Sequence, residues 1–198
     1  MTKKTMQSRK QQVVRDAIYD AAIELFAAKG FDGTTIDDVA EAAGISQRSF
    51  FRYFASKDDL LAASVIKVGT VLAEAVAASP AKFTTLQVMR EAVLSALNYS
   101  ASHPRTRQVV DIAGRSTSAR QAYLSRMMEV EDKLADALAL RLKGASGNSL
   151  RPRMLAGTVI SIMSASVSSW YLGEFQDLNT AGKKAFAEFT RCASEKEA

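Results

Sequence analysis

The chain has 198 residues, a formal net charge of +5, 47% hydrophobic residues and a single cysteine, Cys192. This hydrophobic content can bury a core, whereas one cysteine excludes internal disulfides and thiolate zinc sites and is typical of a reducing cytosol. The sequence contains no stretch that resembles a signal peptide, and no run approaches the roughly 18 uncharged apolar residues of a membrane span. We therefore expect a cytoplasmic protein with no membrane partner.

The positive charge is concentrated at the N-terminus, because the first 15 residues carry no acid and the rest of the chain is neutral overall. Residues 1–8 are predicted to be a disordered basic arm. Such an arm suits contact with phosphates or the minor groove of DNA, and the alternative is a solubilising tail without a binding role. The basic residues of the first 15 positions are Lys3, Lys4, Arg9, Lys10 and Arg15.

The first predicted helix covers residues 9–29, and its apolar residues recur at helical spacing on one side. Gly30 follows the last turn, where a residue of left-handed backbone conformation commonly ends a helix. The stripe expected to be buried consists of Val14, Ile18, Ala21, Ala22, Leu25 and Phe26.

Residues 34–57 predict two short helices joined by a tight turn at Gly44. Thr35 followed by Asp38 is a capping-box start for the first helix, and Ser46 is placed to cap the second. Two helices joined in this way form a helix-turn-helix, which lays its second helix in the major groove of DNA. The alternative is an ordinary helical hairpin within an all-α core.

The outward face of the second helix is polar and carries Gln47, Arg48 and Arg52. Gln pairs bidentately with adenine and Arg with guanine, so these side chains suit base or phosphate contact, with a solvated polar face as the alternative. Thr35 lies at a helix N-terminus, where a hydroxyl and free N–H groups can hold a phosphate. Lys57 places a positive charge at the start of the next helix, where the helix dipole is also positive. A phosphate nearby would account for this unfavourable placement.

The remainder of the chain is predicted to be helical, because it contains little proline and no sustained alternation typical of strands. One long helix is expected over residues 57–78, with the domain boundary inside it. Further helices are expected over residues 84–102, 104–115, 118–143, 151–173 and 180–194.

Three segments, residues 22–35, 38–46 and 50–61, together resemble the TetR family of bacterial transcriptional regulators. The resemblance covers about the first third of the chain and implies an all-α fold of about nine helices. It implies a three-helix DNA-binding domain with a helix-turn-helix (9–55) and a larger helical effector-binding and dimerisation domain (56–198). A homodimeric repressor, released from a palindromic operator on double-stranded DNA by a small-molecule effector, is the function this resemblance implies.

The resemblance also bears on individual residues of the DNA-binding domain. Thr35, Gln47, Arg48, Tyr53 and Lys57 match family DNA-contact positions. Phe51 departs from the family, which often has Tyr there, so a phosphate hydrogen bond is lost and packing against sugar or a thymine methyl remains. The complete predicted DNA-binding set is Thr35, Ser46, Gln47, Arg48, Phe51, Arg52, Tyr53 and Lys57.

Methionine and aromatic residues in the second domain suit an apolar effector pocket, because methionine adapts to irregular apolar shapes. An ordinary core is the alternative for each of them. The predicted lining is Met89, Val93, Tyr99, Met127, Met163 and Trp170. Small residues in 151–173, such as Gly157 and Ser161, suit close helix packing, and with the last helix this segment resembles the family's four-helix dimer interface. Simple packing within one subunit is the alternative.

An enzyme is disfavoured, because the one His (His103) and the one Cys (Cys192) are far apart and no glycine-rich phosphate loop or metal-spaced cluster occurs. We accordingly expect no catalytic residue, no metal and no cofactor. A helical adaptor or ligand-binding protein without a specific DNA target is the other alternative. It explains the apolar C-terminal helices but not a polar recognition face beside a basic arm.

Overall fold

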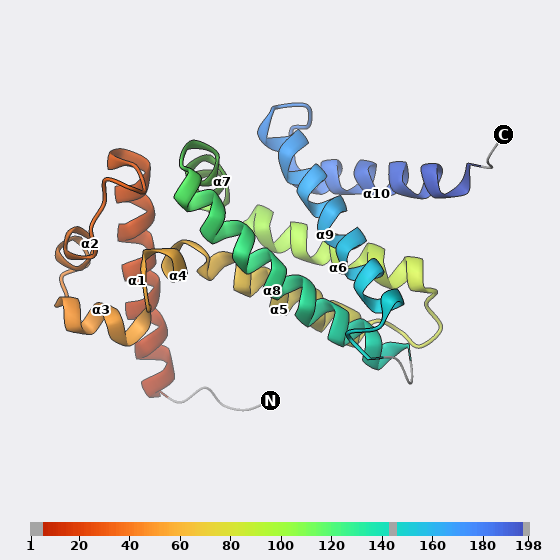
Figure 1. Ribbon diagram of the computed structural model, residues 1–198, viewed down its shortest axis with the longest axis horizontal. Helices are drawn as coiled ribbons and strands as arrows, with labels where there is room; N and C mark the ends of the chain where they lie inside the picture. Colours follow the sequence, from red (N-terminus) through yellow and green to blue (C-terminus); the bar gives the residue numbers. More distant parts are fainter. Residues whose placement is uncertain (1–5, 143–145, 196–198) are drawn as a thin grey trace. The chain divides into compact units, whose positions relative to one another are not determined.

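The computed structural model describes residues 6–142 and 146–195, which form ten α-helices and no strand (Figure 1). The all-α prediction is confirmed, with one helix more than the nine expected. The helices are α1 (Met6–Lys29), α2 (Ile36–Ala42), α3 (Gln47–Tyr53), α4 (Lys57–Leu61), α5 (Ala63–Ala78), α6 (Thr85–Ser102), α7 (Thr106–Arg115), α8 (Thr117–Arg141), α9 (Leu150–Tyr171) and α10 (Leu178–Ser194).

The additional helix arises at Ala62, where the predicted continuous helix over 57–78 is wrong. Ala62 closes α4 with φ −79° and ψ −3°, and its N–H turns back to the carbonyls of Asp58 and Leu60. Ala62 therefore stands between the two helices as a single turn residue, and α5 begins immediately afterwards. Leu60, Leu61 and Ala62 are fully buried, so the break places three consecutive residues in the core.

The start of α1 also differs from expectation. Residues 6–8, assigned to a disordered arm, belong to α1, while residues 1–5 lie outside the described part of the chain. The helix therefore continues for about one turn beyond the predicted start at Arg9.

The described residues divide into two compact units. The first comprises residues 6–63 and 107–125, and the second comprises residues 64–106 together with the described residues after 125. This division differs from a boundary after residue 55, because α7 and the first part of α8 join the N-terminal unit. Val109, Ile112 and Ala119 are buried in the same apolar cluster as the core of α1.

The core of the first unit fixes the helix-turn-helix against α1. Ile18, Ala22 and Phe26 of the predicted stripe are buried, while Val14 and Leu25 pack at its edge. From the other helices, the core receives Val39, Phe50, Phe54, Leu60 and Leu61. Fully burying an apolar side chain of this kind stabilises a fold by about 1.5–3 kcal/mol.

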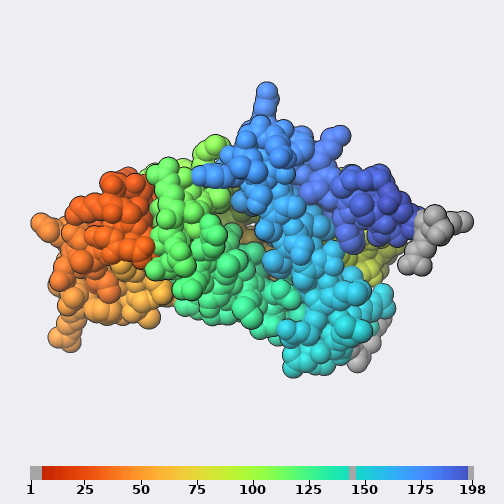
Figure 2. All heavy atoms as spheres, turned by 45° about the horizontal axis from the view of Figure 1, so that its top comes forward, coloured from red at the N-terminus to blue at the C-terminus, as the bar shows by residue number. Residues whose placement is uncertain are grey.

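In the second unit, α6, α9 and α10 pack against one another. Gly182 of α10 faces Leu97 of α6 so closely that an added Cβ would lie 2.2 Å from the leucine Cδ1 atom. Residues of α9 and α10 cover much of the surface seen in Figure 2, in light and dark blue. Along α9, Gly157 is half-buried and Ser161 and Ser164 are exposed, so small side chains line part of its outer face.

Candidate nucleic-acid interface

The turn between α2 and α3 has the geometry that the sequence predicts for a helix-turn-helix. Gly44 adopts φ 65°, the left-handed conformation that glycine adopts without a Cβ penalty. The Ile45 N–H donates to the Ala40 carbonyl at 2.9 Å, and the Ser46 hydroxyl accepts the Ser49 N–H at 3.2 Å. These bonds confirm the predicted turn and the Ser46 cap, and they fix where the second helix begins.

The outward face of α3 carries most of the predicted reading residues. Gln47, Arg48 and Arg52 are exposed, and Phe51 is 50% exposed. Phe50 points the other way and is fully buried. Residues 47, 48, 51 and 52 therefore share one surface, while Phe50 anchors the helix to the core.

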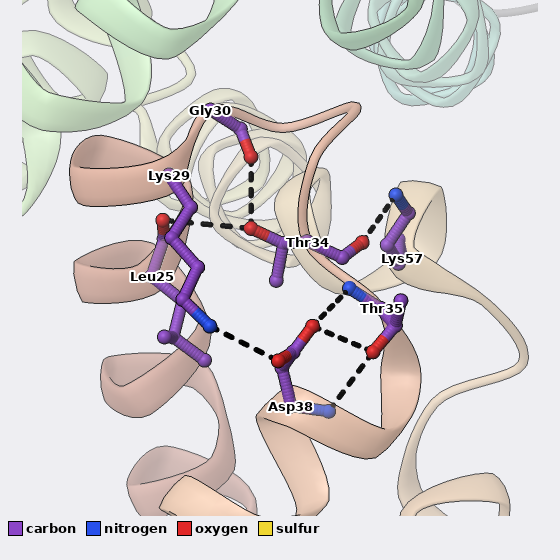
Figure 3. A network of polar contacts seen from close by, with 7 residues as sticks. All are labelled: Leu25, Lys29, Gly30, Thr34, Thr35, Asp38 and Lys57. Carbon is purple, nitrogen blue, oxygen red and sulfur yellow. Dashed lines mark hydrogen bonds and ion pairs between the residues drawn. The ribbon is translucent and has the colours of Figure 1, made fainter.

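Thr35 begins α2 through a reciprocal capping box with Asp38 (Figure 3). The Asp38 carboxylate accepts the Thr35 hydroxyl at 2.6 Å and the Thr35 N–H at 2.7 Å, and Lys29 Nζ lies 3.0 Å away. The hydroxyl bond from Thr35, reinforced by these other contacts, holds the pKa of Asp38 well below its usual range. The Thr35 hydroxyl hydrogen is thus directed at Asp38, so a phosphate at this position would rely on the helix N–H groups or on a rotated hydroxyl.

Lys57 lies at the start of α4, where its ammonium group reaches back to the turn between α1 and α2. Its Nζ atom donates to the Phe31 carbonyl at 2.9 Å and to the Thr34 carbonyl at 2.6 Å, and it lies 4.8 Å from the centre of the Phe31 ring. The buried Thr34 hydroxyl in turn donates to the Gly30 carbonyl at 2.8 Å. The sequence did not indicate these structural partners of Lys57. The two hydrogen bonds use two of the three N–H donors of its ammonium group.

Tyr53 and Arg52 close the far end of α3. Tyr53 is half-buried, and the Arg52 guanidinium carbon lies 5.1 Å from the centre of its ring. Arg15 of α1, which the sequence indicates only as part of the basic N-terminus, donates to the Tyr53 carbonyl at 2.6 Å and stacks over the Phe54 ring at 4.2 Å. No local pattern signals this contact, because the two residues lie 38 positions apart.

The predicted effector residues all lie in the second unit, on α6, α8 and α9. Met89, Val93 and Met163 are buried, whereas Tyr99, Met127 and Trp170 are half-buried. Met89 and Val93 are one turn apart on the same side of α6, as a lining requires. Their role in binding an effector stays a prediction.

Among the residues that the structure describes, no group of three or more His, Cys, Asp or Glu side chains is arranged to hold a metal ion. Within the same ranges, no helix combines the length and apolar character needed to cross a membrane.

A capped α2, a left-handed glycine turn and an α3 with a polar outer face define a helix-turn-helix DNA-binding protein. The family described as "Bacterial regulatory proteins, tetR family" matches residues 18–64, and the family described as "MftR C-terminal domain" matches residues 83–192. The chain therefore belongs to the TetR family of bacterial transcriptional regulators. The expected resemblance, fold class and regulator function are confirmed.

Two relatives are similar over most of the chain. TcmR of Streptomyces glaucescens, an HTH-type transcriptional regulator, is 28% identical over 183 residues, which cover 87% of this chain and 80% of TcmR. MftR of Mycobacterium tuberculosis, designated a mycofactocin biosynthesis transcriptional regulator, is 27% identical over 182 residues, which cover 90% of each chain.

A solved structure shares the fold. FadR of Bacillus subtilis, crystallised in complex with stearoyl-CoA, superposes with a TM-score of 0.57 and 18% identity over 87% of this chain and 95% of FadR. At this level of identity the comparison concerns the fold alone.

Proposed function

We propose that this regulator is a repressor that binds a palindromic operator as a homodimer and leaves it when a small apolar molecule binds. The observation that carries the proposal is the outward face of α3. Its exposed Gln47 and Arg48 lie directly after the Ser46 cap, on a helix held by the buried Phe50. The first turns of a recognition helix are the part that usually reaches base edges.

Within this proposal the predicted residues divide by what they contact. Gln47 and Arg48 read bases, whereas Thr35, Ser46 and Lys57 lie at helix starts where backbone phosphates bind. Phe51, being apolar and half exposed, packs against sugar or a thymine methyl group. Arg52 and Tyr53 extend the contact along the backbone from the end of α3.

We propose a dimer because the DNA-reading face of one subunit is small. One helix-turn-helix buries little DNA, and a two-fold dimer doubles the contacts and explains a palindromic site. The outer face of α9, with Gly157 and Ser161, together with α10, is the surface we assign to the partner, since small side chains allow close helix approach.

An apolar effector is supported by the six candidate lining residues and by the nature of a ligand held by a protein of the same fold. FadR was crystallised with stearoyl-CoA, an acyl compound. The methionines on α6, α8 and α9 could adapt to a flexible chain of this kind. We therefore propose an apolar or acyl-bearing effector in the second unit.

The test is selection of bound sites from random duplex DNA, followed by affinity measurement on the selected site. Arg48→Ala should weaken binding to that site by about 1–3 kcal/mol and relax preference at one base pair in each half-site. Arg90→Ala is the matched control, because Arg90 is a half-exposed arginine of α6 in the second unit. If selection with the wild-type protein enriches no sequence, the proposed operator specificity is wrong.

A further inference from the structure

An open groove of about 380 Å³ lies beside the recognition helix. Only two of its lining residues, Arg52 and Tyr53, belong to the DNA-binding set predicted from sequence. Four residues of α1 form one wall, and Arg52 and Tyr53 from the end of α3 form the other. The α1 residues are Ser8, Gln11, Gln12 and Arg15.

The wall from α1 continues the stripe by which this helix packs into the core. Tyr19, Ala22 and Phe26 are buried on that stripe. The same heptad-like spacing, alternating four and three residues, continues upstream through Arg15, Gln12 and Ser8. A helix lengthened only to enlarge the core would carry apolar residues at these positions, whereas here the stripe changes to hydrogen-bond donors where the core ends.

The six lining side chains are donors of hydrogen bonds, and none of them carries a carboxylate. Arg15 uses one Nη1 bond on the Tyr53 carbonyl, at 2.6 Å, and Arg52 lies over the Tyr53 ring. A guanidinium has five N–H donors, so these contacts orient the two arginines without exhausting them. The nearest acid along α1, Asp16, is not among the lining residues, and it accepts a bond from Gln12 Nε2 at 2.7 Å.

We propose that this groove binds a phosphodiester of the DNA backbone, and that α1 is thereby a second DNA-contacting helix beside α3. The inference rests on the proposed function, because it assigns an additional part of the same interface. Two guanidinium groups and neutral amide donors match the charge and the acceptors of a phosphate oxygen pair. The groove begins at Arg52, one helical turn after Arg48, so one DNA strand can pass from the reading face into it.

The test uses Gln11→Glu in the full-length protein, with Val13→Glu as the matched control. Both substitutions add one negative charge to α1, but Gln11 lines the groove, whereas Val13 is 68% exposed and is not among the lining residues. Gln11→Glu should weaken binding to every duplex alike and lower the slope of log affinity against log salt by about one. Its deficit relative to wild type should then shrink about 3.5-fold between 50 and 200 mM salt.

A backbone scan locates the contact. A single methylphosphonate substitution at one position in each half-site should weaken duplex binding by the wild type and by Val13→Glu. The same substitution should not weaken duplex binding by Gln11→Glu. Equal losses for the two Glu variants, or the same methylphosphonate pattern for both, would overturn the assignment of the groove to DNA. Tight binding of inorganic phosphate that Gln11→Glu abolishes, with duplex affinity unchanged, would overturn it in favour of a free anion.

These outcomes are distinct from failure of the proposed function. The salt slopes can be measured on random-sequence duplex, so the groove can be tested even if no operator is selected. Conversely, a selected operator bound equally well by wild type and Gln11→Glu leaves the operator proposal intact and removes only the groove.

Discussion

Replacing Lys57 with methionine separates two roles that the sequence alone could not distinguish. Methionine keeps the length and apolar stem of lysine but removes the ammonium group that donates to the Phe31 and Thr34 carbonyls. Losing hydrogen bonds from a charged donor costs about 1.5–3 kcal/mol, and losing the cation–π contact with Phe31 adds about 0.5–1 kcal/mol. Because the Phe31 carbonyl also accepts the Thr34 N–H, we expect a fall in the free energy of unfolding of about 2–3 kcal/mol.

The assay is urea denaturation at fixed protein concentration, since association of subunits would otherwise shift the apparent stability. Lys29→Met is the control, because the Lys29 side chain is 53% exposed and its ammonium group pairs with Asp38 on the surface, which is worth about 0–1 kcal/mol. If Lys57→Met destabilises the protein no more than Lys29→Met, the carbonyl contacts do not hold the turn. A loss of duplex affinity at unchanged stability would then assign Lys57 to phosphate binding alone.

Two further predictions concern the same unit. Gly44→Ala should destabilise the protein by about 1–2 kcal/mol through the left-handed backbone alone, because an added Cβ meets nothing within 4 Å. Gly114→Ala, equally unobstructed but inside α7, should instead stabilise it, and equal effects of the two in thermal melts would contradict this reasoning. The lowered pKa of Asp38 means that its charged form stabilises the fold above the unfolded pKa of about 4 and that this contribution is lost as pH falls through the folded value. The stability gap between wild type and Asp38→Asn should therefore be constant near neutral pH and narrow under acid, and a gap that widens in acid unfolding experiments would show that the sign is wrong.

The features predicted correctly from sequence depend on neighbours within a few residues. The caps at Thr35 and Ser46 and the glycine turn at Gly44 each involve groups three to five positions apart, so residue type and spacing are sufficient to identify them. The contacts of Lys57 and Arg15 involve carbonyls 23 to 38 positions away. A backbone carbonyl has no sequence signature, and only the fold decides which one a long cationic side chain reaches.

The division into units shows a second limit of pattern reasoning. The sequence predicts a helix over 104–115, but helical periodicity does not say which core its apolar residues Val109 and Ile112 join. Their place in the apolar cluster of α1 depends on how α7 returns to the N-terminal unit after α5 and α6. The predicted effector residues lie on buried or half-buried sides of their helices. A pattern along one helix does not say which residues of other helices it meets, so their convergence on one pocket stays a prediction.

The turn between α1 and α2 is held from two directions by side chains of the same unit. Lys57 binds its carbonyls from α4, and the Asp32 carboxylate accepts the Ser116 hydroxyl at 2.8 Å. Bonds from Ser116 and Ser118 lower the pKa of Asp32, so this acceptor stays charged at neutral pH. Ser116 also accepts the Ala119 N–H at the start of α8. Any displacement of the start of α8 relative to this turn must stretch the Asp32–Ser116 bond.

Helix α8 contributes residues to both compact units. The helix begins in the DNA-binding unit and its residues from 126 onward belong to the second unit, where the effector residues are predicted. The α1–α2 turn leads directly into Thr35, whose capping box starts α2 and so orients the helix-turn-helix. Within the first unit, the Asp32–Ser116 bond therefore ties the residue that precedes α8 to the turn that leads into the Thr35–Asp38 capping box.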